Sequence, residues 1–286
     1  MLFYVHNLRL KRLLPLAIVA GSFVFSVGAT PNLNLAASPT TKIGLSPWWA
    51  PKDYWLDRIK RQLETIEASS GQFDLVFIGD SITHNWEGWP EEQWQEIIAR
   101  PGVLKKLPAG NRPGWDSLEA LKREFSVLNL GIGGDTTGEV IWRMRYGGQL
   151  KGYEAKCICL MIGTNNREED PRAVADGIKT ILREIRVQQP KAVVLLLPIF
   201  PRGEGVADPR RIRNEAVNGI IREFADGKNV VWVDFIGRFV RPDGVIPRSI
   251  MPDLLHPSAE GYAIWAEEIL PHVRQVCKSK TANKKE

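Results

Sequence analysis

The sequence predicts an α/β fold built on a mainly parallel five-stranded sheet with helices on both faces. Short runs rich in Val, Ile, Leu and Phe alternate with amphipathic segments, which is typical of right-handed crossovers between parallel strands. The runs are nearly continuous in apolar residues, as expected of strands buried on both faces. The expected strands are Phe73–Gly79, Ser126–Gly131, Lys156–Gly163, Lys191–Pro198 and Asn229–Asp234.

The clearest expected helix is Pro171–Gln189, where apolar residues recur at the 3.6-residue spacing and Asp170 precedes a proline at the first position. The same spacing of apolar residues predicts helices at Arg210–Phe224 and Ser258–Val276, and at Thr136–Arg145.

The stretch Glu87–Glu124 is the least regular part of the body, with four tryptophans in or beside it among proline, glycine and charged residues. We expect a surface elaboration whose tryptophans fill small local cores. A cover over the functional site is the alternative.

Length and charge restrict the class of protein. With 286 residues, 44% of them hydrophobic and 25% charged, the chain is long enough for one sizeable core. The net charge of +5 comes from the two ends, since Arg9, Lys11 and Arg12 precede the first apolar run and the tail is basic. The body between them is close to neutral, so no nucleic-acid partner is expected.

Four regions are expected along the chain. Residues 1–29 are predicted to be a signal peptide, because a basic stretch, an apolar run and small residues follow one another. This implies a secreted or periplasmic protein with no stable membrane insertion after cleavage, and an uncleaved N-terminal anchor is the alternative. Residues 30–47 are expected to be a linker, 48–277 the single folded domain and 278–286 a basic disordered tail.

Three cysteines cannot make a disulfide framework. Cys157 and Cys159 are two positions apart on an expected strand, so they point to the same face and pack as small hydrophobes. Cys277, beside the tail, is expected to be a free thiol.

Ser81 stands directly after the first expected strand, where a helix begins. A serine there can act as a nucleophile, or it can only cap the helix. Gly134 and Asn165 follow the carboxyl ends of the next two expected strands. Because ligands bind beyond the carboxyl ends of strands in open α/β sheets, the three residues are expected at one rim.

His256 is the expected general base for Ser81. Asp253, three residues earlier, is close enough in sequence to bond the imidazole and fix its tautomer. Of the other candidates, His84 is expected to be a solvated or capping histidine, and His272 a structural one on the last helix.

Other kinds of site lack their signatures. The glycine-rich run Gly131–Thr136 has a threonine at the third glycine position of a dinucleotide-binding turn, and no phosphate-loop lysine occurs. Neither common zinc motif is present, so no metal is expected. The Gly-x-Ser-x-Gly elbow is also absent around Ser81.

Taken together, the motifs resemble the catalytic blocks of the GDSL, or SGNH, hydrolases. The matching runs are Gly79-Asp80-Ser81-Ile82, Gly131-Ile132-Gly133-Gly134-Asp135-Thr136-Thr137, Gly163-Thr164-Asn165-Asn166 and Asp253-Leu254-Leu255-His256. Within the family the likeness is greatest to the catalytic subunits of intracellular platelet-activating-factor acetylhydrolase, which share a run similar to Pro198–Glu204. The resemblance covers roughly Phe73 to Val276.

The resemblance implies a flavodoxin-like three-layer α/β/α sandwich, the SGNH hydrolase fold, over residues 48–277. It implies Ser81 as nucleophile, His256 as base and Asp253 as the residue that orients the base. The implied oxyanion hole comprises the backbone N–H groups of Ser81 and Gly134 and the side chain of Asn165. The expected export and the Glu87–Glu124 segment depart from those intracellular enzymes, so their phospholipid substrate and dimer are not transferred, and the oligomeric state stays open.

The expected function is an exported serine ester hydrolase that needs neither a metal nor an organic cofactor. The preferred substrate is a small-molecule or glycan ester with a short acyl group such as acetyl, on the grounds of the family's range and the expected export. A lysophospholipase or thioesterase acting on lipid-like acyl esters is the enzymatic alternative. The other alternative is a non-catalytic carbohydrate-binding module on the same fold, against which the complete set of site residues argues.

Overall fold

The computed structural model describes residues 53–89, 92, 95, 96, 99, 112–167 and 169–282. The expected signal peptide and linker lie outside these residues, as does most of the stretch from 90 to 111. The boundaries at residues 29 and 47 therefore stay predictions.

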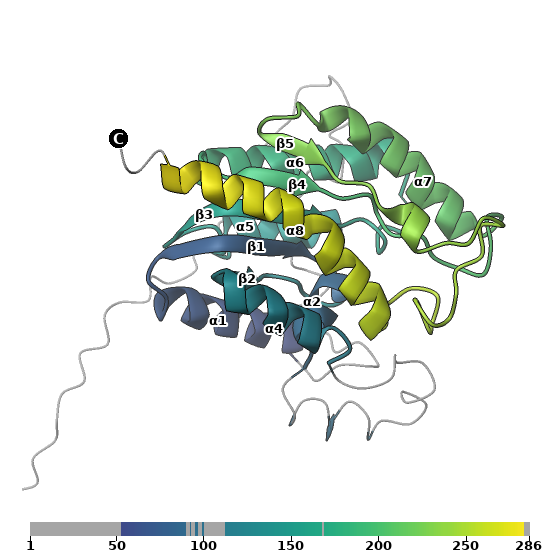
Figure 1. The fold of residues 1–286 in the computed structure, drawn as a ribbon, viewed down its shortest axis with the longest axis horizontal. Coiled ribbons are helices and arrows are strands. Elements are labelled where there is room, and N and C mark those ends of the chain that lie inside the picture. The colour runs from purple at the N-terminus through teal and green to yellow at the C-terminus, as the bar shows by residue number, and fades with distance from the viewer. Residues whose placement is uncertain are drawn as a thin grey trace, which may run out of the picture. The chain divides into compact units, whose positions relative to one another are not determined.

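The described residues form a five-stranded sheet with the strand order β2-β1-β3-β4-β5 (Figure 1). Its strands are β1 (Gln72–Gly79), β2 (Val127–Asn129), β3 (Glu154–Met161), β4 (Val193–Leu196) and β5 (Val230–Trp232). All four neighbouring pairs are parallel. The predicted α/β fold is confirmed, and each strand lies at its expected place in the sequence.

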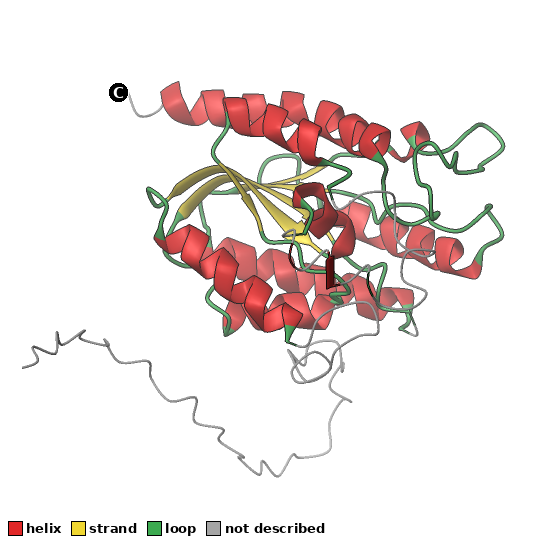
Figure 2. Ribbon diagram, turned by 90° about the horizontal axis from the view of Figure 1, so that it is seen from below, coloured by secondary structure: helices red, strands yellow, loops and turns green. Residues whose placement is uncertain are grey.

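Helices cover both faces of this sheet, which gives three layers (Figure 2). They are α1 (Tyr54–Glu67), α2 (Ser81–Glu87), α4 (Trp115–Glu124), α5 (Thr137–Arg145), α6 (Pro171–Gln188), α7 (Pro209–Ile221) and α8 (Ala259–Ala282), with 3₁₀ turns η2 (Arg222–Phe224) and η3 (Ile236–Arg238). Helices α6 and α7 begin alike. Asp170 and Asp208 each cap a following helix by accepting the N–H two residues on, and a proline stands at the first position.

Alternate residues of each strand supply two separate cores. Val76 and Ile78 of β1 face α5 and α6, whereas Leu75 and Phe77 face α8. Burying each of these large side chains contributes about 1.5–3 kcal/mol to stability. Both cysteines of β3 lie in the core on the α8 side, as predicted from their spacing.

Two helices were not expected. Helix α4 falls inside the segment predicted to be irregular, and it buries Leu118 and Leu121 against the core under α8. Helix α1 precedes the first strand and buries Tyr54 and Trp55 at its start. The tryptophans expected to fill local cores do so in part, since Trp86 is fully buried in the core under α8.

The last helix is longer than expected. Helix α8 passes through Pro271 and continues beyond Cys277 to Ala282. The first residues of the expected disordered tail are therefore helical. Residues 283–286 lie outside the described part of the chain.

Candidate active site

The predicted site residues lie where strands of the sheet end or where the last helix is about to begin. Ser81 is the first residue of α2, directly after β1. Gly134 lies in the loop between β2 and α5, and Asn165 in the loop between β3 and α6. Asp253 and His256 lie in the loop that precedes α8. The parallel sheet gathers the first three loops at one edge.

Three side chains form a hydrogen-bonded row, which we call the Ser81–His256–Asp253 row. Ser81 Oγ lies 2.9 Å from His256 Nε2, although the two residues are 175 positions apart in the sequence. On the other side of the ring, His256 Nδ1 lies 2.7 Å from Asp253 Oδ2. An ionised carboxylate can only accept, so Nδ1 carries the proton and Nε2 is left to accept from the serine hydroxyl.

The loop itself holds the carboxylate in position. Asp253 Oδ1 accepts the backbone N–H groups of His256 at 2.7 Å and Leu255 at 3.1 Å. Burial alone would raise the pKa of Asp253, but these bonds and the contact with His256 hold it below its usual value. The turn requires Leu254 to adopt a φ of 61°, a left-handed conformation that is costly for a branched side chain.

The loop that carries Gly134 contacts Asn165. Gly134 has a φ of 78°, which glycine adopts without strain. One hydrogen of the Asn165 amide is donated to the carbonyl oxygen of Asp135 at 3.0 Å. This bond orients the amide beside the glycine loop and leaves its second hydrogen for another acceptor.

Two side chains form hydrogen bonds with the backbone of Gly133. The sequence had not indicated this role for either of them. The Tyr54 hydroxyl, from α1, donates to the Gly133 carbonyl oxygen at 2.5 Å. The Gly133 N–H donates to His84 Nδ1 at 3.3 Å. His84 is buried and its ring packs at a tilt against that of Trp89, so the expectation of a solvated or capping histidine was wrong. Burial lowers the pKa of His84 well below its usual value, which keeps the ring neutral and Nδ1 able to accept.

Asp135 is held by a second pair of contacts. Trp55 Nε1 donates to its Oδ1 at 2.7 Å, and Arg143 Nε donates to its Oδ2 at 2.8 Å. Arg143 and Asp135 are both fully buried, and Arg143 also donates to the carbonyl oxygen of Gly79 at the end of β1. Removing one partner of such a pair leaves an uncompensated buried charge, so this network fixes the glycine loop relative to β1.

Asp80, next to Ser81, is fully buried and caps α2 by accepting the N–H of Ile82 at 2.9 Å. Burial raises its pKa from 3.8 to about 6. His272 lies on α8, as expected. Within the described residues, no group of three His, Cys, Asp or Glu side chains is placed to hold a metal ion.

A three-layer α/β sandwich with a serine, a histidine and an aspartate hydrogen-bonded in a row at the sheet edge is the architecture of a class of ester hydrolases. Residues 77–264 match the model of the GDSL-like lipase/acylhydrolase family. The chain therefore belongs to this family and is an ester hydrolase.

Curated relatives agree. The chain is 32% identical over 212 residues to platelet-activating factor acetylhydrolase IB subunit alpha2 of Rattus norvegicus, which covers 74% of this chain and 80% of the relative. It is 38% identical over 191 residues to the alpha1 subunit of Pongo abelii, covering 66% and 71%.

Solved structures share the fold. A GDSL-like lipase from Bacteroides thetaiotaomicron superimposes with a TM-score of 0.55 at 16% identity, covering 76% of this chain and 97% of the other. A protein described as a putative platelet activating factor from Streptococcus pneumonia superimposes with a TM-score of 0.54 at 20% identity, covering 76% and 92%.

Proposed function

We propose that this chain is an exported serine ester hydrolase in which Ser81 is the nucleophile, His256 the general base and Asp253 the residue that orients the base. The observation that carries the proposal is the Ser81–His256–Asp253 row. Its two hydrogen bonds give the serine a base and the base a fixed tautomer.

The reaction then runs in two halves. Ser81 Oγ attacks the ester carbonyl while His256 Nε2 takes its proton, and the same proton is passed to the departing alcohol oxygen. Water, deprotonated by His256, then releases the acyl group from the serine. Each step uses groups that the chain itself supplies.

The negative charge that develops on the carbonyl oxygen needs donors. The backbone N–H groups of Ser81 and Gly134 and the free hydrogen of the Asn165 amide are the proposed ones. The contacts of Tyr54 and His84 with Gly133 support this proposal, since donors stabilise a transition state most when they need no reorganisation.

We propose a short acyl group, acetyl in particular, as the part released, and a small molecule or glycan as its carrier. The curated relatives are named acetylhydrolases, which supports the acyl group. Secretion or location in the periplasm is proposed from residues 1–29 of the sequence. No helix in the described part of the chain is long and apolar enough to cross a membrane.

Covalent labelling tests the nucleophile directly. A fluorophosphonate should modify the protein in a one-to-one ratio on the peptide that contains Ser81. The rate of p-nitrophenyl acetate hydrolysis should fall in proportion to the fraction of protein that is labelled. Ser81→Ala should prevent both the labelling and the hydrolysis. Ser126→Ala, just before β2 at the opposite end of the sheet, is the matched control and should be labelled like the parent. Labelling at another serine would overturn the assignment.

A further inference from the structure

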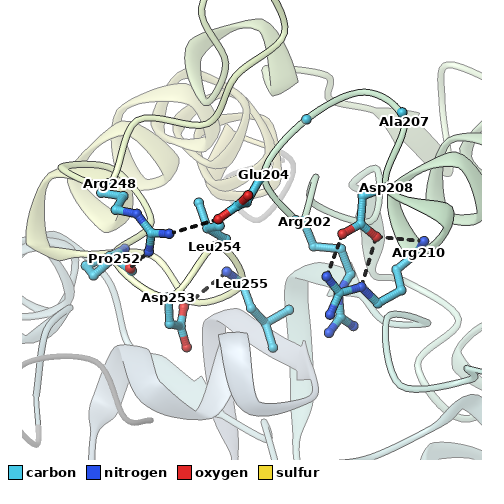
Figure 3. A pocket seen from close by; sticks show the side chains of 12 residues that line it. Arg202, Glu204, Ala207, Asp208, Arg210, Arg248, Pro252, Asp253, Leu254 and Leu255 are labelled. Atoms are coloured by element: carbon cyan, nitrogen blue, oxygen red, sulfur yellow. Dashed lines mark hydrogen bonds and ion pairs between the residues drawn. The ribbon is translucent and has the colours of Figure 1, made fainter. Parts of the chain in front are cut away.

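A cavity of about 830 Å³ adjoins the loop that carries Asp253 and His256. Two segments line it, residues 202–210 after β4 and residues 248–255 before α8 (Figure 3). The second segment includes Asp253, so one member of the Ser81–His256–Asp253 row lines the cavity.

Arg202 in this cavity is a buried cation without an ion pair among the described residues. Only 5% of its surface is exposed. Its Nη1 donates to the carbonyl and hydroxyl oxygens of Thr164, both at 3.0 Å, while its buried Nε has no partner among the described residues. A guanidinium has five donors, so most of the donors of Arg202 have no partner within the described part of the chain.

The nearby carboxylates are already engaged. Asp208 binds Arg210, with Oδ2 2.5 Å from Nη2, and also caps α7. Glu204 is 3.4 Å from Arg248, and Asp253 is bonded to His256. Figure 3 shows Asp208 directed to Arg210, with Arg202 beside them.

The surroundings of Arg202 are cationic as well. Burial and then the positive charges of Arg210, Arg167 and Arg213 lower its pKa to about 10, against an opposing effect of the Asp208 carboxylate, so the side chain is still charged at neutral pH. Arg213 does not line the cavity, but its Nη2 is a second buried donor without a partner in the described part of the chain. Leaving charged donors unpaired in a buried site is costly, and a bound anion would remove that cost.

We propose that this cavity binds an anionic oxygen group, a carboxylate or a phosphate, carried on the alcohol part of the ester substrate, with Arg202 as its principal partner. A guanidinium matches the planar geometry of such groups with two parallel hydrogen bonds. This inference rests on the proposed function, because the position of the alcohol follows from the role of His256.

The alcohol side is assigned from the proton transfer. His256 has to reach the departing alcohol oxygen, so the alcohol lies on the His256 side of Ser81. The loop of residues 252–255, next to His256, forms one wall of the cavity. An anionic substituent on the alcohol would therefore point toward Arg202.

Esters of similar shape that differ in the charge of the alcohol part test the proposal. For the parent protein at low salt, kcat/KM should be roughly tenfold higher for 3-carboxyphenyl acetate than for the neutral 3-carbamoylphenyl acetate, a difference of about 1.4 kcal/mol. The corresponding phosphate-bearing phenyl acetate decides which anion is preferred. No preference for either anion over the neutral ester in the parent would overturn the proposal.

Variants test whether Arg202 is responsible for the preference for the anionic ester. Arg202→Gln should bring the ratio of the anionic to the neutral ester close to one, and a folded Arg202→Gln that keeps the parent ratio would overturn the role of Arg202. Damage to Thr164 and its neighbour Asn165 would slow both esters alike, so the ratio separates anion binding from a structural effect. Arg241→Gln, an exposed arginine paired with Asp243 outside the cavity, is the matched control and should keep the ratio.

Binding without turnover separates this inference from the proposed function. Calorimetry with Ser81→Ala should show tighter binding of 3-carboxyphenyl acetate than of the carbamoyl ester. If the parent hydrolyses neither ester but this preference in binding is present, the proposed function fails and the anion site stands. If the parent hydrolyses both equally and binding shows no preference, the anion site fails and the proposed function stands.

Discussion

His84 Nδ1 accepts the backbone N–H of Gly133 at 3.3 Å, across 49 positions of sequence. Because Tyr54 binds the carbonyl oxygen of the same residue, Gly133 is held at both its N–H and its carbonyl. The N–H of the next residue, Gly134, is thereby fixed in direction. A tyrosine and a histidine outside the Ser81–His256–Asp253 row thus together orient one proposed oxyanion donor.

His84→Ala should therefore be more damaging than its place outside the row suggests. It removes the acceptor of a buried N–H and leaves a space beside Trp89, so we expect a loss of about 1–3 kcal/mol in the free energy of unfolding. We also expect kcat for p-nitrophenyl acetate to fall about tenfold or more. Urea unfolding and steady-state kinetics measure the two effects. His272→Ala is the control, and equal effects of both substitutions would contradict the positioning role.

His256→Ala should reduce kcat nearly as much as Ser81→Ala, by a factor of about 10⁴ or more, because members of such a row act as a unit. The double variant should be scarcely slower than either single one. Thermal unfolding should show that both proteins stay folded. Losses that multiply in the double variant would mean that the two residues act independently.

Asn165→Ala should lower kcat by roughly 10²–10³, about 3–4 kcal/mol of transition-state stabilisation, with a smaller change in KM, since an oxyanion donor acts mainly as charge develops. Asn165→Asp keeps the shape but replaces the donor with a charged acceptor, so it should be at least as slow as Asn165→Ala. Asn166 is unsuited to this purpose, since it is buried and bonded to Thr137. A raised KM with unchanged kcat would place Asn165 in ordinary substrate binding.

Asp80→Asn should make the protein more stable than the parent at neutral pH but not in acid. The pKa of Asp80 is raised to about 6 by burial, so the folded protein keeps a proton that the unfolded chain releases above about pH 3.8. The contribution of Asp80 to stability is therefore lost as the pH rises through 6. The advantage of the variant, measured by urea unfolding from pH 4 to 8, should grow toward about 3 kcal/mol. An advantage that is constant with pH would contradict the assignment.

The acyl-chain preference separates an acetylesterase from the lipid-directed alternative. With p-nitrophenyl esters, kcat/KM should be highest at about two to four carbons and fall about tenfold or more by eight, a loss of about 1.4 kcal/mol in relative transition-state binding. A profile that rises toward eight or twelve carbons would favour a lysophospholipase or thioesterase.

Local signals in the sequence were enough for much of the fold. The expected helix Pro171–Gln189 matches α6 to within one residue, because its apolar spacing and the capping Asp170 are properties of neighbouring residues. Apolar runs located the strands for the same reason. The approach of Ser81 to His256 was predicted as well, but from motifs resembling a known family together with the rule that loops after parallel strands meet at one edge.

Only the tertiary structure decided what surrounds those residues. Tyr54 and Gly133 are 79 positions apart, and nothing in the neighbourhood of either one indicates that they meet. His84 lies three residues after Ser81 in the sequence, yet its side chain is buried and accepts a hydrogen bond from the glycine loop. Arg202 was part of a motif, but its burial and its unused donors depend on Thr164 and on two loops that meet around the cavity. Burial and hydrogen-bond partners are set by segments that are distant in the chain, so local periodicity and short motifs cannot predict them.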